Sequence, residues 1–422
     1  DDLSYTSSLS TSVNLEGFNL RKIDDHLNLK FNFYQTSQKN EDNKTNPTVF
    51  PNIKYYSGNN IINEYNTSNV YEFYNIFRDK NTTIHSRNQQ KISHKFDAYR
   101  EFIRFNSKIS FDSEIYNQIF QTEDKLIENE KFHTGTYYRI FPIFGISASS
   151  PFKFKKNKFD LTYNPSLQLV LTPGSSNSNK ISNEDSSNNT FSINDSLNRY
   201  SGTDKLDNSK RINYGITINN ENLILELFQS YEFTNNSNFH SENGNNNNLS
   251  DLLGSIEYQK INNINYAFRY DVNDEYLKEQ NINTDIINKF GTFSLSYLDS
   301  NSKVNNVVTK DTETINYKMS SNKFLKFSKF EISGLFDLQK EINTEYNVGY
   351  NYFDECFGIN LDFSRKSYEE DNLKPQDKLT LMFSFKNIGS YQSTNLAVSE
   401  NDKQDIKWEE YNVDNSLFAI YE

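Results

Sequence analysis

Apolar and polar residues alternate along almost the whole chain, and this period of two is the feature that most restricts the fold. Successive segments place Leu, Ile, Val, Phe and Tyr on one parity and Asn, Ser, Asp, Arg and Lys on the other. Side chains of a β-strand point to alternate faces, so each segment predicts a strand with one apolar and one polar face. About nineteen such segments follow one another without a helical interlude.

The predicted strands cover both halves of the chain. They lie at 3–15, 27–33, around 53–55, at 71–77, within 84–120 (two strands, the second carrying Phe105, Ile109, Phe111 and Ile115), on both sides of the Lys-rich turn Lys153–Lys158, and at 212–218, 223–233, 264–272, 293–297, 315–319, 330–338, 346–352, 357–363 and 379–385. A soluble β-sandwich also alternates. A series this long favours a closed barrel, because closure removes sheet edges and lets every backbone group pair inside lipid.

Composition supports a membrane barrel. Hydrophobic residues make up 35% of the 422 residues, against roughly 45–50% (counting Gly) in a typical globular chain. There are 34 Phe and 28 Tyr but one Trp. A membrane β-barrel needs a thin outward apolar band with aromatic girdles, while its lumen and loops are polar. A genome rich in A and T would favour the same residues, but it would not produce their alternation.

We therefore predict an all-β protein, a large antiparallel transmembrane β-barrel with about 18–20 strands in this chain. The barrel region is residues 1–389, and 390–422, where the alternation is lost, is a C-terminal tail. The chain opens Asp1-Asp2-Leu3 without the features of a signal peptide, so we expect a mature protein or a fragment.

The connections suggest which end of the barrel faces outward. Pro173–Lys210, Thr234–Ser250 and Asn301–Lys310 are long and polar, whereas Asn219–Asn222 and Asn262–Asn263 are short. Outer-membrane barrels carry their long loops outside and their short turns in the periplasm. This rule predicts that Pro173–Lys210 is extracellular and that the connection around Asp354–Cys356 is periplasmic.

Several classes of function are disfavoured. The net charge of −12 speaks against a nucleic-acid partner, and no apolar run approaches the 18 residues of a transmembrane helix. Sequence motifs of serine hydrolases, zinc proteases, P-loop enzymes and calcium loops are absent, and no local spacing supports a Ser-His-Asp triad. We expect no enzyme activity, no cofactor and no metal. The histidines lack metal-ligand spacing and are expected to be exposed polar residues: His26, His85, His94, His133 and His240.

Cys356 is the one cysteine of the chain, so no disulfide can form within it. Two interpretations stay open. The thiol is free and buried, as lone cysteines often are. Alternatively, it is half of a disulfide to a residue outside this chain, because the periplasm is oxidising.

Three stretches in order resemble the signature of the lipopolysaccharide-assembly outer-membrane proteins, the LptD/OstA family, in its alphaproteobacterial form. They are Pro47–Tyr55, the run from Asn183 to Gly215, and Val348–Cys356 continuing to Gly389. The middle stretch carries the wording most specific to the family, "NEDS … SLNRYSGTDK … RINYG". Its signature positions are Asn183, Glu184, Asp185, Ser186, Asn198, Arg199, Gly202, Asp204, Arg211, Tyr214 and Gly215.

The resemblance implies a role in the cell outer membrane. Such proteins take lipopolysaccharide from a periplasmic bridge protein and place it in the outer leaflet. The family barrel has about twenty-six strands, is plugged by a lipoprotein partner (LptE-like) and can part between its first and last strands. A periplasmic jellyroll domain precedes the barrel and receives the lipid. The alternative is a passive outer-membrane porin or substrate channel.

The chain departs from the family pattern in three respects. The jellyroll is not present in this sequence, and the strand count is lower and odd, so we expect a C-terminal portion of a larger barrel. The family's cysteine partner near the N-terminus is missing, which leaves a disulfide of Cys356 open. Thr203 stands before Asp204 where the family usually has an aromatic residue. We also expect the loop around Leu197–Arg211 to be ordered, with partners for Arg199 and Asp204.

Overall fold

The computed structural model describes the chain in sixteen ranges and contains β-strands with one short 3-10 helix, Asn43–Thr45 (η1). The described residues are 8–36, 43–80, 82–127, 131–156, 159–174, 177–187, 196–234, 248–260, 262–304, 306–321, 327–354, 356–367, 376–386, 389–394, 396–397 and 407–411. Leu3 and Tyr5 of the first predicted strand, Lys158 of the Lys-rich turn and His240 lie outside them. No helix among these residues is long and apolar enough to cross a membrane.

The described residues form 24 strands. These are β1 (Ser8–Phe18), β2 (His26–Thr36), β3 (Thr48–Tyr56), β4 (Asn60–Ile62), β5 (Tyr65–Phe77), β6 (Asn88–Arg104), β7 (Ser107–Ile127), β8 (Lys131–Ser149), β9 (Phe152–Lys156), β10 (Phe159–Leu171), β11 (Lys210–Asn219), β12 (Leu223–Glu232), β13 (Leu252–Gln259), β14 (Asn263–Asp271), β15 (Tyr276–Asn288), β16 (Gly291–Val304), β17 (Val307–Ser321), β18 (Ser328–Asp337), β19 (Ile342–Phe353), β20 (Phe357–Lys366), β21 (Gln376–Phe385), β22 (Gly389–Thr394), β23 (Leu396–Ala397) and β24 (Lys407–Tyr411). Five of them, β4, β9, β22, β23 and β24, have six residues or fewer. The remaining nineteen match the predicted 18–20.

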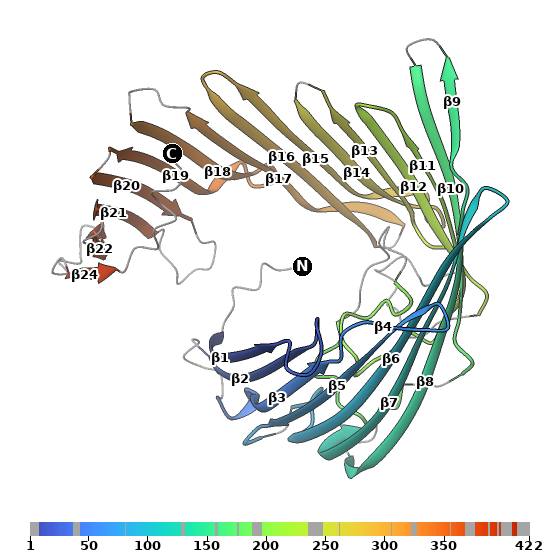
Figure 1. Cartoon of the computed structure of the whole chain (residues 1–422). Coiled ribbons are helices and arrows are strands. Elements are labelled where there is room, and N and C mark those ends of the chain that lie inside the picture. The colour runs from blue at the N-terminus through green and yellow to red at the C-terminus, as the bar shows by residue number, and fades with distance from the viewer. Residues whose placement is uncertain are drawn as a thin grey trace. The chain divides into compact units, whose positions relative to one another are not determined.

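The chain divides into two compact units. Unit 1 comprises Asp1–Ile218, Glu226–Leu253 and Asp271–Glu275, and unit 2 comprises Asn219–Leu225, Gly254–Tyr270 and Tyr276–Glu422. In unit 1, β1, β2, β3, β5, β6, β7, β8 and β10 pair in that order, each antiparallel to the next (Figure 1). The short strand β4 pairs with β5, and β9 pairs with β10. All these connections are hairpin-like, as the alternating pattern predicts.

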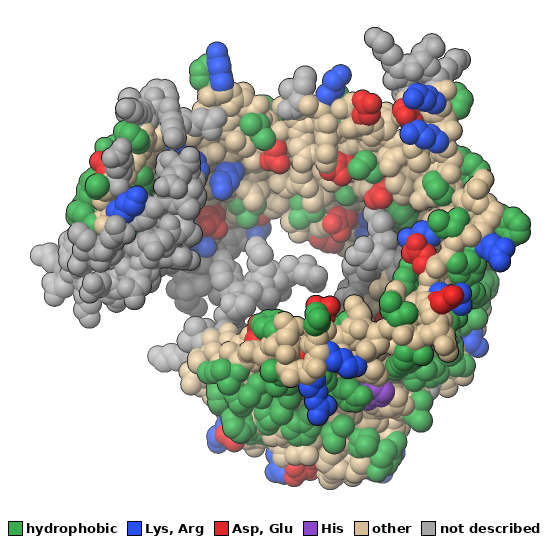
Figure 2. Space-filling view, in the orientation of Figure 1, with side chains coloured by type: hydrophobic (Ala, Val, Ile, Leu, Met, Phe, Trp, Pro, Cys, Tyr) green, Lys and Arg blue, Asp and Glu red, His purple; other side chains and the backbone are tan. Residues whose placement is uncertain are grey.

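The sheet of unit 1 has one apolar and one polar face. On β8, Tyr138 and Ile140 are exposed, whereas Arg139 and Phe141 between them are buried. Cross-strand pairing continues this division, since Ile119 of β7 lies opposite Tyr138. Figure 2 shows hydrophobic side chains gathered over the part of unit 1 that carries β2 to β8. We call this outer surface the apolar face, because it offers a β-barrel the surface that lipid requires.

The core of unit 1 lies on the opposite, polar face. It consists of four strand residues and two residues from the connection between β10 and β11, and all six are at most 5% exposed: Tyr116, Phe141, Ile143, Val170, Leu197 and Leu206. The strands alone therefore do not complete this core. We call the connection, residues 172–209, the β10–β11 loop; its described residues, 172–174, 177–187 and 196–209, pack against the polar face.

In unit 2, β15 to β21 pair in sequence order, again antiparallel. The segment predicted as a C-terminal tail contains three short strands, and β22 pairs with both β21 and β24. Its described backbone therefore continues the strand pairing beyond residue 389.

Three local predictions were wrong. Phe105 is not in a strand but forms, with Asn106, the two-residue turn between β6 and β7. Both have positive φ, 52° and 58°, which is the turn geometry that fits the twist of paired strands. Asn301–Lys310 is not a long loop, because β16 and β17 extend by further cross-strand pairs to Val304↔Val307 after a bulge at Ser300/Asn301. Lys153 and Lys155 lie in strand β9 and not in a turn.

Cys356 lies in the short connection between β19 and β20, and its side chain is exposed. The interpretation as a buried thiol is therefore wrong. Its backbone N–H donates to Asp354 Oδ1 at 2.9 Å, as in a tight turn capped by an aspartate. A disulfide to a residue outside the chain stays a prediction.

Candidate functional site

The β10–β11 loop holds its own shape through two asparagines of the signature. Asn183 Oδ1 accepts the backbone N–H of Ser186 at 3.1 Å, and its amide donates to the Ser186 carbonyl at 2.7 Å. Asn198 Oδ1 accepts the N–H of Asp207 at 3.0 Å, while its amide donates to the carbonyl of Gly202 at 3.2 Å. An asparagine side chain can satisfy donors and acceptors of the backbone at once, which suits a loop that lacks ladder hydrogen bonds.

Lys91 of β6 is the centre of the contacts between the loop and the sheet. Its ammonium lies 2.8 Å from Asp185 Oδ2, 2.9 Å from Asp204 Oδ1 and 3.1 Å from Glu72 Oε2 of β5. The Lys91 side chain is fully buried. A buried ammonium needs opposite charges and acceptors around it, and here two of its three carboxylates come from the loop. The loop is thus fixed to the strand by charge as well as by packing.

Thr203 completes the surroundings of Lys91. Its hydroxyl accepts a hydrogen bond from the ammonium at 2.7 Å. The resemblance described above led us to expect an aromatic residue at this position. In this chain a hydroxyl oxygen therefore accepts a hydrogen bond from one of the three N–H groups of the ammonium. An aromatic ring does not provide this oxygen acceptor.

Asp204 is held by the strands and by the backbone of the loop. Tyr74 of β5 donates to its Oδ1 at 2.8 Å, and the N–H groups of Glu184 and Asp185 donate to its Oδ2 at 2.8 and 3.2 Å. Burial raises the pKa of Asp204 to about 6; the negative charge of Asp185 adds to this, and Lys91 opposes it.

The pKa of Asp185 is shifted in the opposite direction. Its Oδ1 accepts the N–H groups of Thr203 and Asp204 at 3.0 and 2.8 Å. Burial acts to raise its pKa, but the charge of Lys91 and the hydrogen bonds that Asp185 accepts outweigh burial and lower the pKa to about 2. Of the two loop carboxylates on Lys91, Asp185 is thus the one that holds its charge to low pH.

Side chains of the strands also bind the backbone of the loop. Arg139 of β8 donates to the carbonyls of Thr203 and Asp204 at 2.7 and 2.8 Å, and Gln118 of β7 donates to the Thr203 carbonyl at 3.0 Å. Gln89 of β6 exchanges two hydrogen bonds of 2.8 Å with the backbone of Ser182. These contacts position the main chain of the loop independently of its charges.

Two further ion-pair groups attach the loop to the strands. Next to Asp185, Glu184 forms a two-point pair with Arg78, at 2.6 and 3.1 Å. Near the end of the loop, Asp207 lies 2.6 Å from Arg199 and 2.9 Å from Arg211. Arg199 also reaches Glu232 of β12 at 2.9 Å. Both Arg199 and Asp204 thus have the partners that the sequence led us to expect.

Gly202 is required by close packing. A Cβ at this position would overlap the carboxylate and the backbone carbonyl of Asp185. Gly215 is similar, because a Cβ there would overlap the ring of Phe228. Nine signature positions, from Asn183 to Arg211, therefore meet in the loop and its attachment, whereas Tyr214 and Gly215 belong to β11 beside it.

Sequence reasoning did not find the partners of the loop on the strands. The most important are Tyr74, Arg78, Gln89, Lys91, Gln118, Arg139 and Glu232. The available signal was weak: Gln89 and Lys91 share one parity of β6, but long polar side chains on a polar face do not by themselves indicate a partner.

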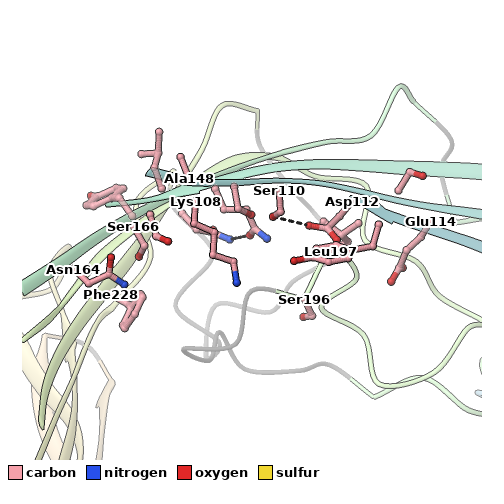
Figure 3. A pocket seen from close by; sticks show the side chains of 18 of the residues that line it. Lys108, Ser110, Asp112, Glu114, Ala148, Asn164, Ser166, Ser196, Leu197 and Phe228 are labelled. Atoms are coloured by element: carbon pink, nitrogen blue, oxygen red, sulfur yellow. Dashed lines mark hydrogen bonds between the residues drawn. The ribbon is translucent and has the colours of Figure 1, made fainter. Parts of the chain in front are cut away.

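A cavity of about 550 Å³ lies beside the loop on the polar face. Figure 3 shows Lys108, Ser110 and Asp112 of β7 with Asn164 and Ser166 of β10 around it, and Ser196 and Leu197 of the loop at its edge. Most of its lining residues carry hydroxyl, amide or carboxylate groups, and the rings of Tyr99 and Phe228 also line it. A second cavity, of about 280 Å³, lies under Asn198–Thr203 and contains Lys54, Glu72 and Lys95. Among the described residues, no group of three or more His, Cys, Asp or Glu side chains could hold a metal ion.

Comparison with solved structures gives several distant likenesses. The siderophore receptor PirA from Acinetobacter baumannii shares 8% identity, with 92% of this chain and 73% of that chain covered and a TM-score of 0.44. The ferric enterobactin receptor PfeA from Pseudomonas aeruginosa, as its R480A mutant with enterobactin, also shares 8%, with 92% and 73% covered and a TM-score of 0.46. The ferric citrate transporter FecA shares 8%, with 92% and 71% covered and a TM-score of 0.43.

No curated protein matches the chain. The family model "LptD: LPS transport system D" matches residues 1–327, which is more than three quarters of the sequence and includes the whole β10–β11 loop. This span also contains Lys91, Arg139 and the other strand residues that hold the loop. The chain therefore belongs to the LptD family, an outer-membrane protein family with a role in lipopolysaccharide transport.

Proposed function

We propose that this chain is the β-barrel through which lipopolysaccharide is placed in the outer leaflet of the outer membrane. The observation that carries the proposal is the division of the unit 1 sheet into an apolar face and a polar face with its own cavity. Lipopolysaccharide has an acylated part and a saccharide part. A sheet with a lipid-facing surface and a separate polar chamber offers each part a matching surface.

The chemistry of the larger cavity supports this proposal. Hydroxyl, amide and carboxylate groups can exchange hydrogen bonds with the many hydroxyls of a saccharide, and Tyr99 and Phe228 offer apolar ring surfaces to sugar C–H groups. About 550 Å³ lies within the range of roughly 300–1,000 Å³ of small-molecule sites. The saccharide part of the lipid is thus expected to pass beside the β10–β11 loop.

The proposal includes partners. A lipoprotein of the LptE type would occupy the barrel, and a periplasmic bridge protein would deliver lipopolysaccharide through a domain that precedes this region. Purification from the native membrane in mild detergent is expected to bring down the small lipoprotein in a fixed ratio. Its absence from an intact preparation would contradict this part of the proposal.

Site-specific photocrosslinking in cells tests the path of the lipid. A photoreactive residue at Ser166, which lines the cavity, should capture lipopolysaccharide during active synthesis, and the product is detected with an antibody to its sugar part. A matched probe at Lys318 of β17, outside the cavity, controls for contact with lipopolysaccharide elsewhere. No product at Ser166 in correctly assembled protein, together with a steady large conductance in planar bilayers, would indicate a passive channel instead.

A further inference from the structure

The hairpin formed by β9 and β10 extends the sheet of unit 1 beyond its neighbours (Figure 1). The end of β8 and the start of β7 lie together, since Ser149 pairs with Lys108 and Ser107 contacts Ser150 at 2.6 Å. β9 begins after that point and pairs with the first residues of β10, from Tyr163↔Phe152 to Phe159↔Lys156. The hairpin therefore projects from the end of the sheet that carries the two-residue turn Phe105–Asn106.

One side of this hairpin is aromatic. Phe152 and Phe154 pair with Tyr163 and Leu161, so their side chains share a face. Tyr163 and Leu167 are four residues apart on β10, so the side-chain period of two places both on the same side of the sheet. Leu167 is an exposed residue of the apolar face. Phe152 and Phe154 are 55% and 56% exposed, and the rings of Phe152 and Tyr163 are 5.4 Å apart. The apolar face thus continues onto the hairpin as an exposed aromatic patch.

The other side is basic. Lys153 and Lys155 lie opposite Thr162 and Asp160, on the face away from the aromatic residues. Lys153 lies 3.2 Å from Asp160 Oδ2, and its side chain is 66% exposed. An exposed pair of this kind contributes little to stability and leaves the ammonium accessible. Because the chain as a whole has a net charge of −12, a face with two lysines is more positively charged than the average surface.

The distance from Leu167 of the apolar face to the aromatic patch is comparable to the thickness of the membrane interface. Tyr163 is four residues from Leu167, which at about 3.3 Å per residue and a tilt of about 35–45° corresponds to roughly 10 Å along the membrane normal. The headgroup region extends roughly 5–8 Å beyond the hydrocarbon on each side. Aromatic rings favour this depth, and lysine side chains reach from it to the lipid phosphates.

We propose that the β9–β10 hairpin is a binding surface for anionic phospholipid headgroups of the periplasmic leaflet. Phe152 and Phe154 insert at the boundary between headgroups and acyl chains, and Lys153 and Lys155 bind the phosphates. Aromatic rings prefer the interface, and lysine stems long enough to reach lipid phosphates are common beside them. The periplasmic leaflet follows from the short turns at this end of the sheet. The proposal needs a membrane-spanning sheet and does not depend on lipopolysaccharide transport.

Fluorescence quenching tests the proposal with the full chain in lipid vesicles. Trp408 is replaced by Phe, and Phe152→Trp places the single tryptophan on the hairpin. The vesicles are phosphatidylcholine with a small, equal fraction of either brominated phosphatidylglycerol or brominated phosphatidylcholine. Quenching by the brominated phosphatidylglycerol should be stronger, since each lysine near the surface enriches anionic lipid on the order of fivefold.

Two double variants separate local binding from total charge. Lys153→Gln with Lys155→Gln should equalise quenching by the two brominated lipids and leave quenching by phosphatidylcholine unchanged. Lys318→Gln with Lys329→Gln removes the same charge from unit 2 and should keep the preference. Phe154→Trp serves as a second probe if Phe152→Trp does not fold. Equal quenching in the unmodified hairpin, a preference that survives the first double variant, or no quenching by either lipid would each overturn the proposal.

Discussion

At the scale of single residues, Lys91 joins the loop to the sheet. It neutralises carboxylates from β5 and from the β10–β11 loop in a fully buried position. Replacement by an apolar residue of similar length would leave Glu72, Asp185 and Asp204 without their shared cation. Loss of one partner of a buried pair costs about 3–5 kcal/mol, because the remaining charges stay desolvated.

Lys91→Met is therefore expected to lower the free energy of unfolding by about 3–5 kcal/mol. The measurement is urea unfolding of the purified protein in detergent, followed by circular dichroism. Lys318→Met, at an exposed position of β17, is the control and should change stability by less than about 0.5 kcal/mol. Equal effects of the two substitutions would show that the Lys91 ion pairs contribute nothing.

Asp204 gives a second prediction, about pH. Its folded-state pKa of about 6 lies above the usual 3.8, so the folded protein binds this proton more tightly than the unfolded chain does. The corresponding stability is present below about pH 4 and is lost as the pH rises through 6. Because Asp204→Asn cannot titrate, the wild type should lose on the order of 3 kcal/mol relative to this variant between pH 4 and 7. A difference in unfolding free energy between the wild type and the variant that stays constant from pH 4 to 7 would contradict this prediction.

At the scale of elements, the strands could be predicted from sequence and the attachment of the loop could not. A strand shows its pattern locally, because residues two apart share a face. The contact between Lys91 and Asp204 joins residues 113 positions apart, and nothing near Lys91 marks it as a partner of the loop. The turn at Phe105 was mistaken for strand because the aromatic residue fits the alternation there, while the backbone turns with positive φ.

A substitution at Gly202 tests whether the β10–β11 loop is packed as one unit. Gly202→Ala forces the backbone away from Asp185 and should loosen the contacts on Lys91 as a group. Limited trypsin digestion is expected to cut after Lys205 faster in the variant than in the wild type. Gly17→Ala is the control, since its Cβ would meet the flexible side chain of Leu20 at 3.3 Å. Unchanged cleavage at Lys205 would mean that the loop tolerates a shift at this point.

At the scale of the whole molecule, the apolar face should lie in lipid. Ile140 is 67% exposed on β8 among other apolar residues. Lysine on the lipid-facing side near the middle of the membrane costs about 2–4 kcal/mol. Ile140→Lys should therefore lower both the stability in lipid vesicles and the amount of protein in the outer membrane. Ser147→Lys, on the polar face beside the cavity, should have little effect on either quantity. A larger effect of Ser147→Lys than of Ile140→Lys would mean that the face we call polar is the one that lies in lipid.

The division into two faces was predictable because lipid imposes one requirement on every strand. The family assignment adds the substrate class, which no alternation of residues contains. The site between loop and sheet depends on contacts between residues that are distant in sequence. Only the structure shows that side chains on the polar face of each strand from β5 to β8 contact the β10–β11 loop.

The most direct test of the central claim measures the arrival of new lipopolysaccharide at the cell surface. Cells are depleted of this protein, pulse-labelled in a lipopolysaccharide sugar, and treated with a membrane-impermeant reagent that modifies surface-exposed lipopolysaccharide. Labelled lipopolysaccharide should stay inaccessible after depletion and become accessible again when the wild-type chain is restored. Normal arrival at the surface in depleted cells would contradict the central claim.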